Sequence, residues 1–191
     1  MRTKFASKFA SINAEYDAQD YLAAKRAELI EPDYDAIPAE LRERRQWVGM
    51  FLELRQNKAY SKPAKVPIRA DSGIRADTSN PKEWSSFDAA VAARERFSLD
   101  GIGYVPSKDD PFVFLDFDDC RDALIDIIEP VVADLIRAFG TYAEISCSGT
   151  GVHVILRGKM PGSRKRGKLD GINVEMYESG QFLVMTGRTL S

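Results

Sequence analysis

The sequence predicts a mixed α/β fold in which a mostly antiparallel sheet is covered by a helix on one face. From residue 112, the apolar strand PFVFLDFDD is followed by ALIDIIEPVVADLIRAF, whose apolar residues recur at helical spacing. Only strand-like segments come after it: TYAEISC, GVHVILRG, INVEMY and FLVMTG. Turn-forming residues or a basic loop separate these strands. We therefore expect one sheet face to be covered by the helix, bent at Pro130, and the other face to be open.

The upstream half predicts two helices and two strands. Residues 4–29 have helical spacing of apolar side chains, and the stretch EPDYDAIPAEL that follows has two prolines and is typical of a linker. WVGMFLEL predicts a buried strand that leads into the basic loop RQNKAYSKPAKVPIR. A second helix begins near WSSFDAAVAARERF, where Ser85 or Ser86 can cap the first turn. IGYV at 102–105 predicts a short strand.

Composition limits the class of protein. With 191 residues, 44% of them hydrophobic and 29% charged, the chain is long enough for a globular fold. We expect a helical extension and linker over residues 1–40 and a folded domain over 41–191. No apolar run could cross a bilayer and no signal-peptide core is present, so a cytoplasmic location without a membrane partner is expected. Two cysteines and one histidine are too few for a four-ligand zinc site of their own.

Positive charge is concentrated in two segments of a chain whose formal net charge is −2. Residues 55–70 and residues 157–168 each contain several lysines and arginines and no acid. Each segment could be an ordinary solvated loop. Together they are also candidates for contact with a nucleic-acid backbone.

Three carboxylates end the apolar run FVFLDFDDC, at positions 116, 118 and 119. Because successive side chains of a strand point to opposite faces, Asp116 and Asp118 share a face opposite Val113, Leu115 and Phe117. The same alternation places Glu175 on one face of INVEMY and His153 on one face of GVHVIL. Two close carboxylates raise each other's proton affinity unless a cation lies between them, and Mg²⁺ or Mn²⁺ prefers such oxygen ligands.

Simpler explanations exist for each feature alone. The DFDD segment could end at a sheet edge, with Asp118 or Asp119 capping a helix that starts near Asp122. Glu175 could be a solvated strand residue, and His153 could be structural. The conjunction favours a site, because the glycine-rich turn SGTG at 148–151 directly precedes the histidine, and such turns let backbone N–H groups approach a phosphate.

The series LDFDDC, TYAEISCSGTGVHV, VEMY and FLVMTGR resembles the catalytic core of the archaeo-eukaryotic primase superfamily, specifically the primase-polymerase domains of phages, plasmids and integrated elements. The likeness extends over roughly residues 45–191. One departure is that the family's second motif is often Ser-x-His, whereas Gly151 stands two positions before His153. The upstream part of the likeness consists of Trp47, Lys62, Pro63, Trp84, Ser86, Phe87 and the segment 101–105.

The resemblance implies an archaeo-eukaryotic primase-like fold, in which a mostly antiparallel sheet like that of RNA-recognition motifs packs with an N-terminal αβ subdomain. It implies a template-dependent nucleotidyltransferase, a DNA primase, a DNA polymerase or both, with Mg²⁺ or Mn²⁺ as cofactor. Its partners would be a single-stranded DNA template or primer-template, NTP or dNTP, and a helicase module in a longer replication protein of the bacterial or phage-host cytoplasm.

The resemblance also implies residue roles. Asp116, Asp118 and Glu175 would hold metal, and with His153 they would form the catalytic set. Nucleotide binding would fall to Ser148, Gly149, Gly151, His153, Lys62, Lys65, Tyr177 and Arg188, and DNA binding to Arg164, Lys165, Arg166 and Lys168.

Two other functions are open to the same sequence. A catalytically inert module that grips single strands would need aromatic side chains on the open face, where the acids would instead repel phosphate. A replication-initiator nuclease usually needs a histidine pair for its metal, and this chain has one histidine.

Overall fold

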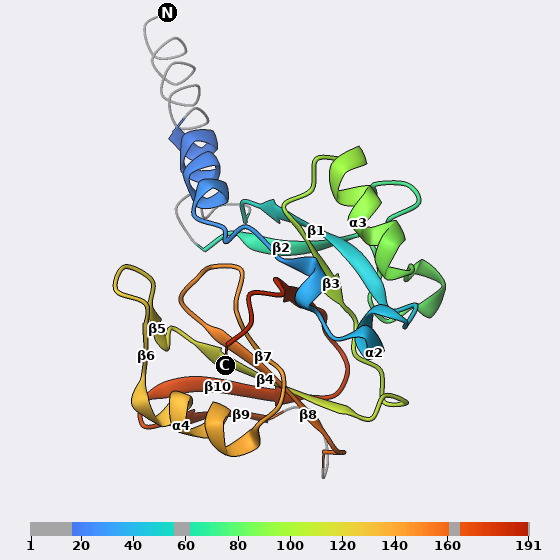
Figure 1. The fold of residues 1–191 in the computed structure, drawn as a ribbon. Coiled ribbons are helices and arrows are strands. Elements are labelled where there is room, and N and C mark those ends of the chain that lie inside the picture. Colours follow the sequence, from blue (N-terminus) through green and yellow to red (C-terminus); the bar gives the residue numbers. More distant parts are fainter. Residues whose placement is uncertain (1–16, 56–61, 161–164, 191) are drawn as a thin grey trace, which may run out of the picture.

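The computed structural model describes residues 17–55, 62–160 and 165–190. They form two antiparallel sheets that lie one above the other and share a core (Figure 1). This confirms the predicted mixture of helices with mainly antiparallel sheet. None of the helices within these ranges is long and apolar enough to span a bilayer.

The upper sheet in Figure 1, called sheet A, has the strand order β11-β3-β1-β2. Its strands are β1 (Trp47–Glu53), β2 (Ala64–Ile68), β3 (Gly101–Tyr104) and β11 (Leu183–Met185). Helix α3 (Phe87–Arg96) packs against β1 and β3, and the Ser86 side chain caps it by accepting a hydrogen bond from Ala89 N. Shorter helices are η1 (Tyr34–Ala36), α2 (Ala39–Arg42) and η2 (Pro81–Glu83).

The lower sheet, called sheet B, has the strand order β7-β8-β4-β10-β9. Its strands are β4 (Phe112–Asp118), β7 (Ala143–Ile145), β8 (Val152–Arg157), β9 (Lys165–Leu169) and β10 (Ile172–Tyr177). Helix α4 (Pro130–Phe139) lies below it and ends at Gly140, whose φ of +55° is a left-handed cap. Strand β4 is the central strand of this order, with β8 on one side and β10 on the other.

The two faces of sheet B have different covers, whereas the sequence predicted one covered face and one open face. Leu115 and Phe117 point to α4 and pack with its buried residues Val132 and Ile136. Phe112 and Phe114 point to sheet A. The predicted open face is thus covered along the first half of β4 and becomes accessible only at Asp116 and Asp118, whose side chains are 28% and 46% exposed.

A column of aromatic rings joins the sheets. Phe114 stacks on Tyr177 within sheet B, with ring centroids 5.9 Å apart, and on Tyr104 of sheet A, with centroids 5.7 Å apart. Trp47 meets Tyr104 edge to face at 5.3 Å. These rings are almost completely buried, so they fix the position of β4 beneath sheet A.

The N-terminal segment packs on the core from residue 22 onward. Leu22 is buried, and Arg26 Nε donates to Asp100 Oδ1 at 2.9 Å while its Nη2 donates to the Leu52 carbonyl at 3.1 Å. The linker after this helix passes very close to Gly187. A Cβ atom at residue 187 would lie 1.7 Å from Asp33 O. Residues 4–16 of the predicted helix lie outside the described ranges.

The prediction of one bent helix over residues 123–139 is wrong. The first part forms a hairpin of β5 (Arg121–Asp122) and β6 (Ile127–Ile128), and α4 begins at Pro130. A proline disfavours helical backbone in the residue before it, and Glu129 is extended, with ψ 130°. Inside the hairpin, Asp122 Oδ1 accepts a hydrogen bond from Leu124 N. Because the hairpin replaces the start of the predicted helix, neither Asp118 nor Asp119 caps a helix there.

The strands of the structure also differ from the predicted strands at three places. The two basic segments contain β2 and β9, which are edge strands instead of loops. Edge strands tolerate charged side chains and a proline such as Pro67, which is why their sequences lack a strand signal. Strand β11 pairs with β3 of sheet A, so the strands that follow residue 112 are divided between both sheets.

The aromatic column predicts where the fold is most sensitive. Replacing Phe114 with Ala leaves a cavity between the sheets and should cost about 3–5 kcal/mol of unfolding free energy, measured by urea denaturation. Phe139→Ala is the matched control, because Phe139 is 41% exposed and its loss should cost much less. Equal losses in the two variants would contradict this role for the column.

Candidate active site

A row of charged side chains crosses sheet B at one level. Asp116 on β4 lies opposite His153 on β8 and opposite Glu175 on β10. His153 in turn lies opposite Glu144 on β7, and Glu175 lies opposite Arg166 on β9. Residues directly opposite one another in a ladder share a face, with Cβ atoms about 5 Å apart. The three carboxylates and the histidine therefore lie side by side, and we call them the acid row.

A second, shorter row of polar side chains lies two residues further along the strands. Asp118 pairs with Asn173, and Asn173 pairs with Lys168. Asp118 shares the face of the acid row, because it lies two residues beyond Asp116. The predicted convergence of Asp116, Asp118, Glu175 and His153 on one face is thus what the strand register produces.

His153 is buried and held from one side by Glu144. Its Nδ1 lies 2.9 Å from Glu144 Oε1, while its Nε2 faces Asp116 Oδ1 at 3.7 Å. Glu144 is completely buried, and its second oxygen Oε2 accepts from Tyr142 OH at 2.7 Å, Gly187 N at 2.8 Å and Thr186 N at 3.1 Å. Because a carboxylate only accepts hydrogen bonds, Glu144 sets Nδ1 of His153 as a donor and leaves Nε2 toward the acids.

Glu144 was missed in the sequence. Its signal is a charged residue inside the short apolar strand segment TYAEISC, where an unsatisfied carboxylate would be costly. The donors that satisfy Glu144 come from residues 142, 186 and 187, and the two backbone donors are about 40 positions away in the chain. No local pattern reveals such partners.

Negative charge at the outer end of β4 is not fully compensated. Partial burial raises the pKa of Asp118 above its ordinary 3.8, and the neighbouring charge of Asp116 raises it further, while Lys62 opposes both effects. Lys62 Nζ lies 3.9 Å from Asp118 Oδ1, and Arg166 Nε lies 2.6 Å from Glu175 Oε1. Within the described ranges, no three His, Cys, Asp or Glu side chains are arranged as they stand to hold a metal ion.

The predicted SGTG turn lies beside the carboxylates and is ordered by hydroxyl groups. Ser148 Oγ lies 3.1 Å from Ser146 Oγ and 3.2 Å from Thr150 Oγ1, and Thr150 donates to Asp119 Oδ1 at 3.1 Å. Gly151 has no room for a side chain, because a Cβ there would lie 2.7 Å from Phe117 O. This contact explains why glycine, and not the serine of the family motif, precedes Val152.

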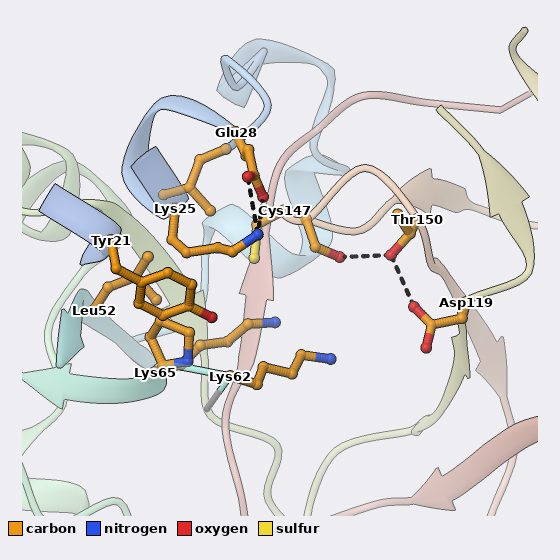
Figure 2. Close-up of a pocket in the computed structure, with 12 residues that line it drawn as sticks. Tyr21, Lys25, Glu28, Leu52, Lys62, Lys65, Asp119, Cys147 and Thr150 are labelled. Atoms are coloured by element: carbon orange, nitrogen blue, oxygen red, sulfur yellow. Dashed lines mark hydrogen bonds and ion pairs between the residues drawn. The ribbon is translucent and has the colours of Figure 1, made fainter. Parts of the chain in front are cut away.

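A pocket of about 350 Å³ opens next to this turn (Figure 2). Its walls come from four parts of the chain: the helix of residues 17–27 with the turn after it, sheet A, the end of β4 and the turn between β7 and β8. The lining residues are Tyr21, Lys25, Glu28, Leu29, Leu52, Lys62, Pro63, Lys65, Asp119, Cys147, Ser148 and Thr150. The pocket thus places cationic side chains beside the carboxylate cluster.

Comparison with known proteins gives one informative relative. No protein-family model matches the chain. Over 125 residues the chain is 36% identical to the "DNA Primase-polymerase" of Nitratiruptor phage NrS-1, an alignment that covers 64% of this chain. The chain is a homologue of a phage primase-polymerase. This confirms the resemblance predicted from the motifs, and the chain spans 17% of the length of that relative.

Most predicted nucleotide-binding residues of this primase-polymerase homologue lie around the pocket. Lys62, Lys65 and Ser148 line it, and Gly149 and Gly151 shape the adjoining turn. Tyr177 is an exception. It is on the face of Glu175, as expected, but it is 1% exposed and stacked on Phe114, so contact between this ring and a sugar does not fit the structure.

The remaining predicted residues lie at the edges of sheet B. Arg188 is exposed on the segment that pairs with β7 through Ile145 N. On β9, Arg166 and Lys168 share the face of the acid row, whereas Lys165 points to the opposite face. Arg164 lies outside the described residues.

The role of Glu144 can be tested through the one histidine of the chain. In Glu144→Gln, the amide oxygen should remain with the three donors at Oε2, so the NH₂ group faces Nδ1. We expect His153 to change from the Nδ1–H to the Nε2–H tautomer, observed by ¹⁵N NMR of histidine-labelled protein at a pH where the ring is neutral. Retention of the Nδ1–H form in the variant would show that Glu144 does not set the tautomer.

The charge at Asp118 should oppose folding when no divalent cation is bound. Because the pKa of Asp118 is raised in the folded protein, ionisation costs stability as the pH rises above 3.8. Asp118→Asn should therefore raise Tm at pH 7 in the presence of a chelator, and the gain should vanish below about pH 3.5. A lower Tm for the variant at pH 7 would contradict this assignment.

Proposed function

We propose that the chain carries the catalytic site of a template-dependent nucleotidyltransferase, a primase, DNA polymerase or both, that extends or initiates strands from nucleoside triphosphates. The observation that carries the proposal is Asp116 flanked by Glu175 and His153 in one row, beside a cationic pocket, in a homologue of a phage primase-polymerase. Polymerisation needs carboxylates on a rigid platform, and β4 lies at the centre of sheet B.

The carboxylates suit a divalent cation. Asp116, Asp118 and Glu175 offer hard oxygen ligands on one face, and partial burial together with the neighbouring charge of Asp116 raises the pKa of Asp118, so a bound cation would favour its ionised form. Lys62 is paired with Asp118 and Arg166 with Glu175, so positive charge already lies where a divalent cation would neutralise these carboxylates. Bound Mg²⁺ or Mn²⁺ would supply the positive charge that stabilises the α-phosphate and the departing pyrophosphate.

The protein's own groups have separate tasks in this proposal. His153, with Nδ1 held by Glu144, in its doubly protonated form donates from Nε2 to a phosphate oxygen. Lys62 and Lys65 reach the pocket from sheet A and attract the triphosphate, while the glycine turn over 148–151 lets it come close to the backbone. The burial of Phe114 and Tyr177 keeps the platform rigid.

The template is proposed to cross the exposed edge of sheet B. Arg166 and Lys168 on β9 lie on the face of the acid row and are exposed to solvent. Such side chains bind phosphate without reading sequence, so the affinity for single-stranded DNA should fall steeply with salt. Among the described residues, the exposed aromatic side chain is Phe139 of α4, on the opposite face of sheet B, which gives an inert single-strand module less support, because such modules stack bases on rings.

Primer extension tests the proposal. With a primer-template, dNTPs and Mn²⁺ or Mg²⁺, the chain should incorporate nucleotides, and a chelator should stop the reaction. Replacing both Asp116 and Asp118 with Asn should lower the rate by about three orders of magnitude, the scale found when transition-state charge stabilisation is lost. Asp134→Asn, an exposed acid on α4, is the control and should retain full rate.

The same assay distinguishes the alternative. An inert binding module would retain single-strand affinity and show no incorporation in the unaltered chain. Equal incorporation by the unaltered chain and by the double variant would exclude the proposed site.

A further inference from the structure

The helix of residues 17–27 forms one wall of the pocket beside the acid row, although the motifs of the resemblance begin only near residue 45. Tyr21, Lys25, Glu28 and Leu29 from this helix and its end line the pocket. Figure 2 shows Lys25 extending from the helix toward the space that Lys62 and Lys65 enter from sheet A. The pocket is therefore incomplete without the N-terminal segment.

The helix is fixed in place by contacts in which the Lys25 side chain takes no part. Leu22 packs into a cluster with Met50, Leu52, Cys147 and Val184. One turn further along the same side of the helix, Arg26 donates to Asp100 Oδ1 and to the Leu52 carbonyl, and its guanidinium lies 4.6 Å from the ring centroid of Phe51. Just after the helix, Ile30 N donates to Cys147 O at 3.0 Å. These contacts fix the helix as a wall of the pocket without using the Lys25 side chain.

We propose that Lys25 is a further nucleotide-binding residue, which contacts the polyphosphate of the incoming nucleoside triphosphate, and that Glu28 competes with that polyphosphate for the Lys25 ammonium group. The proposal rests on the proposed function, because it takes the pocket as the nucleotide site. It assigns to this chain a substrate contact from outside the region of the motifs.

The charges of the pocket fit an anionic ligand. Three ammonium groups line the pocket, Lys25 from the N-terminal helix and Lys62 and Lys65 from β2 and the residues just before it, together with two carboxylates, on Glu28 and Asp119. Lys62 Nζ lies 3.9 Å from Asp118 Oδ1, and although desolvation lowers the pKa of Lys65, its neighbours Cys147, Asp116 and Asp118 together raise it above its ordinary value. The cationic pocket and the carboxylates that would hold metal are thus close enough to act on one molecule that carries several phosphates.

Size and surface chemistry agree with a nucleotide. A volume of about 350 Å³ is at the lower end of the range for small-molecule sites. Hydroxyl groups of Ser148 and Thr150 can donate to phosphate or sugar oxygens, and Leu52, Pro63 and the Tyr21 ring offer apolar surface to the rest of the ligand. An inorganic anion would use only the cationic part of this lining.

Glu28 is placed as an internal substitute for the ligand. Lys25 Nζ lies 2.6 Å from Glu28 Oε2 and 2.9 Å from Oε1, so the ammonium is paired before a nucleotide arrives. Side chains three positions apart on a helix form such pairs readily, and the exposed geometry makes the pair weak. A triphosphate with higher charge density would displace the Glu28 carboxylate.

The test compares variants of the two residues in the full 191-residue chain. Equilibrium binding is measured with a non-hydrolysable deoxynucleoside triphosphate by calorimetry, and KM and kcat for dNTP are measured by primer extension. Lys25→Gln should weaken binding and raise KM by about tenfold, since losing one charged hydrogen bond at a half-exposed site costs about 1.4 kcal/mol. Glu28→Gln should tighten binding by about two- to fivefold, with kcat little changed in both.

The opposite signs separate a ligand contact from a structural pair. If the pair only stabilised the helix, both variants would lower Tm and affinity together, which would overturn the proposal. In the double variant, the gain from Glu28→Gln should shrink, because it acts mainly through Lys25. Lys82→Gln, an exposed lysine of η2, is the control and should leave affinity and KM unchanged.

Failure of this inference and failure of the proposed function give different results. Unchanged nucleotide affinity in Lys25→Gln, in a chain that extends primers, overturns the inference and leaves the function standing. Nucleotide binding that depends on Lys25, in a chain that incorporates nothing, supports the pocket and overturns the function. If Lys25→Gln weakens binding of a single-stranded oligonucleotide but not of the nucleotide, Lys25 contacts a strand and the inference fails.

Discussion

The register of β4 between β8 and β10 is the constraint on which the site depends. Because the side chains of a strand alternate, a shift by one residue would turn Asp116 and Asp118 toward α4 and bury their charge among apolar groups. The penalty for that burial fixes the register as firmly as the apolar residues do. The same register brings Glu175 and His153 to either side of Asp116, so the fold and the carboxylate cluster have one origin.

A single face of sheet B serves two purposes along its length. Phe112 and Phe114 meet sheet A, and two residues later the same face carries carboxylates that reach solvent. The aromatic column lends rigidity to the acids beside it, while the partial burial of Asp118 and its proximity to Asp116 cost stability that a bound cation would restore. Active sites commonly show this exchange of stability for function. Here the two effects occupy neighbouring positions of one strand.

Strand alternation was enough to predict that Asp116, Asp118, Glu175 and His153 share a face, since this depends only on local geometry. Long-range contacts were not predictable. Glu144 is satisfied by backbone groups distant in sequence, and the helix of residues 17–27 gives no local sign that it lines a pocket. The hairpin over 121–128 was missed because its apolar residues happen to match a helical period, while Pro130 decides where α4 begins.

The central claim is that Asp116, Asp118 and Glu175 bind a divalent cation next to the nucleotide. A crystal structure with Mn²⁺ and a non-hydrolysable dNTP tests it most directly, because manganese is located by its anomalous scattering. The account predicts manganese within about 2.2 Å of carboxylate oxygens of Asp116 and Asp118, with Glu175 released from Arg166. Manganese bound only elsewhere, with the Arg166–Glu175 pair intact and the nucleotide outside the pocket, would contradict it.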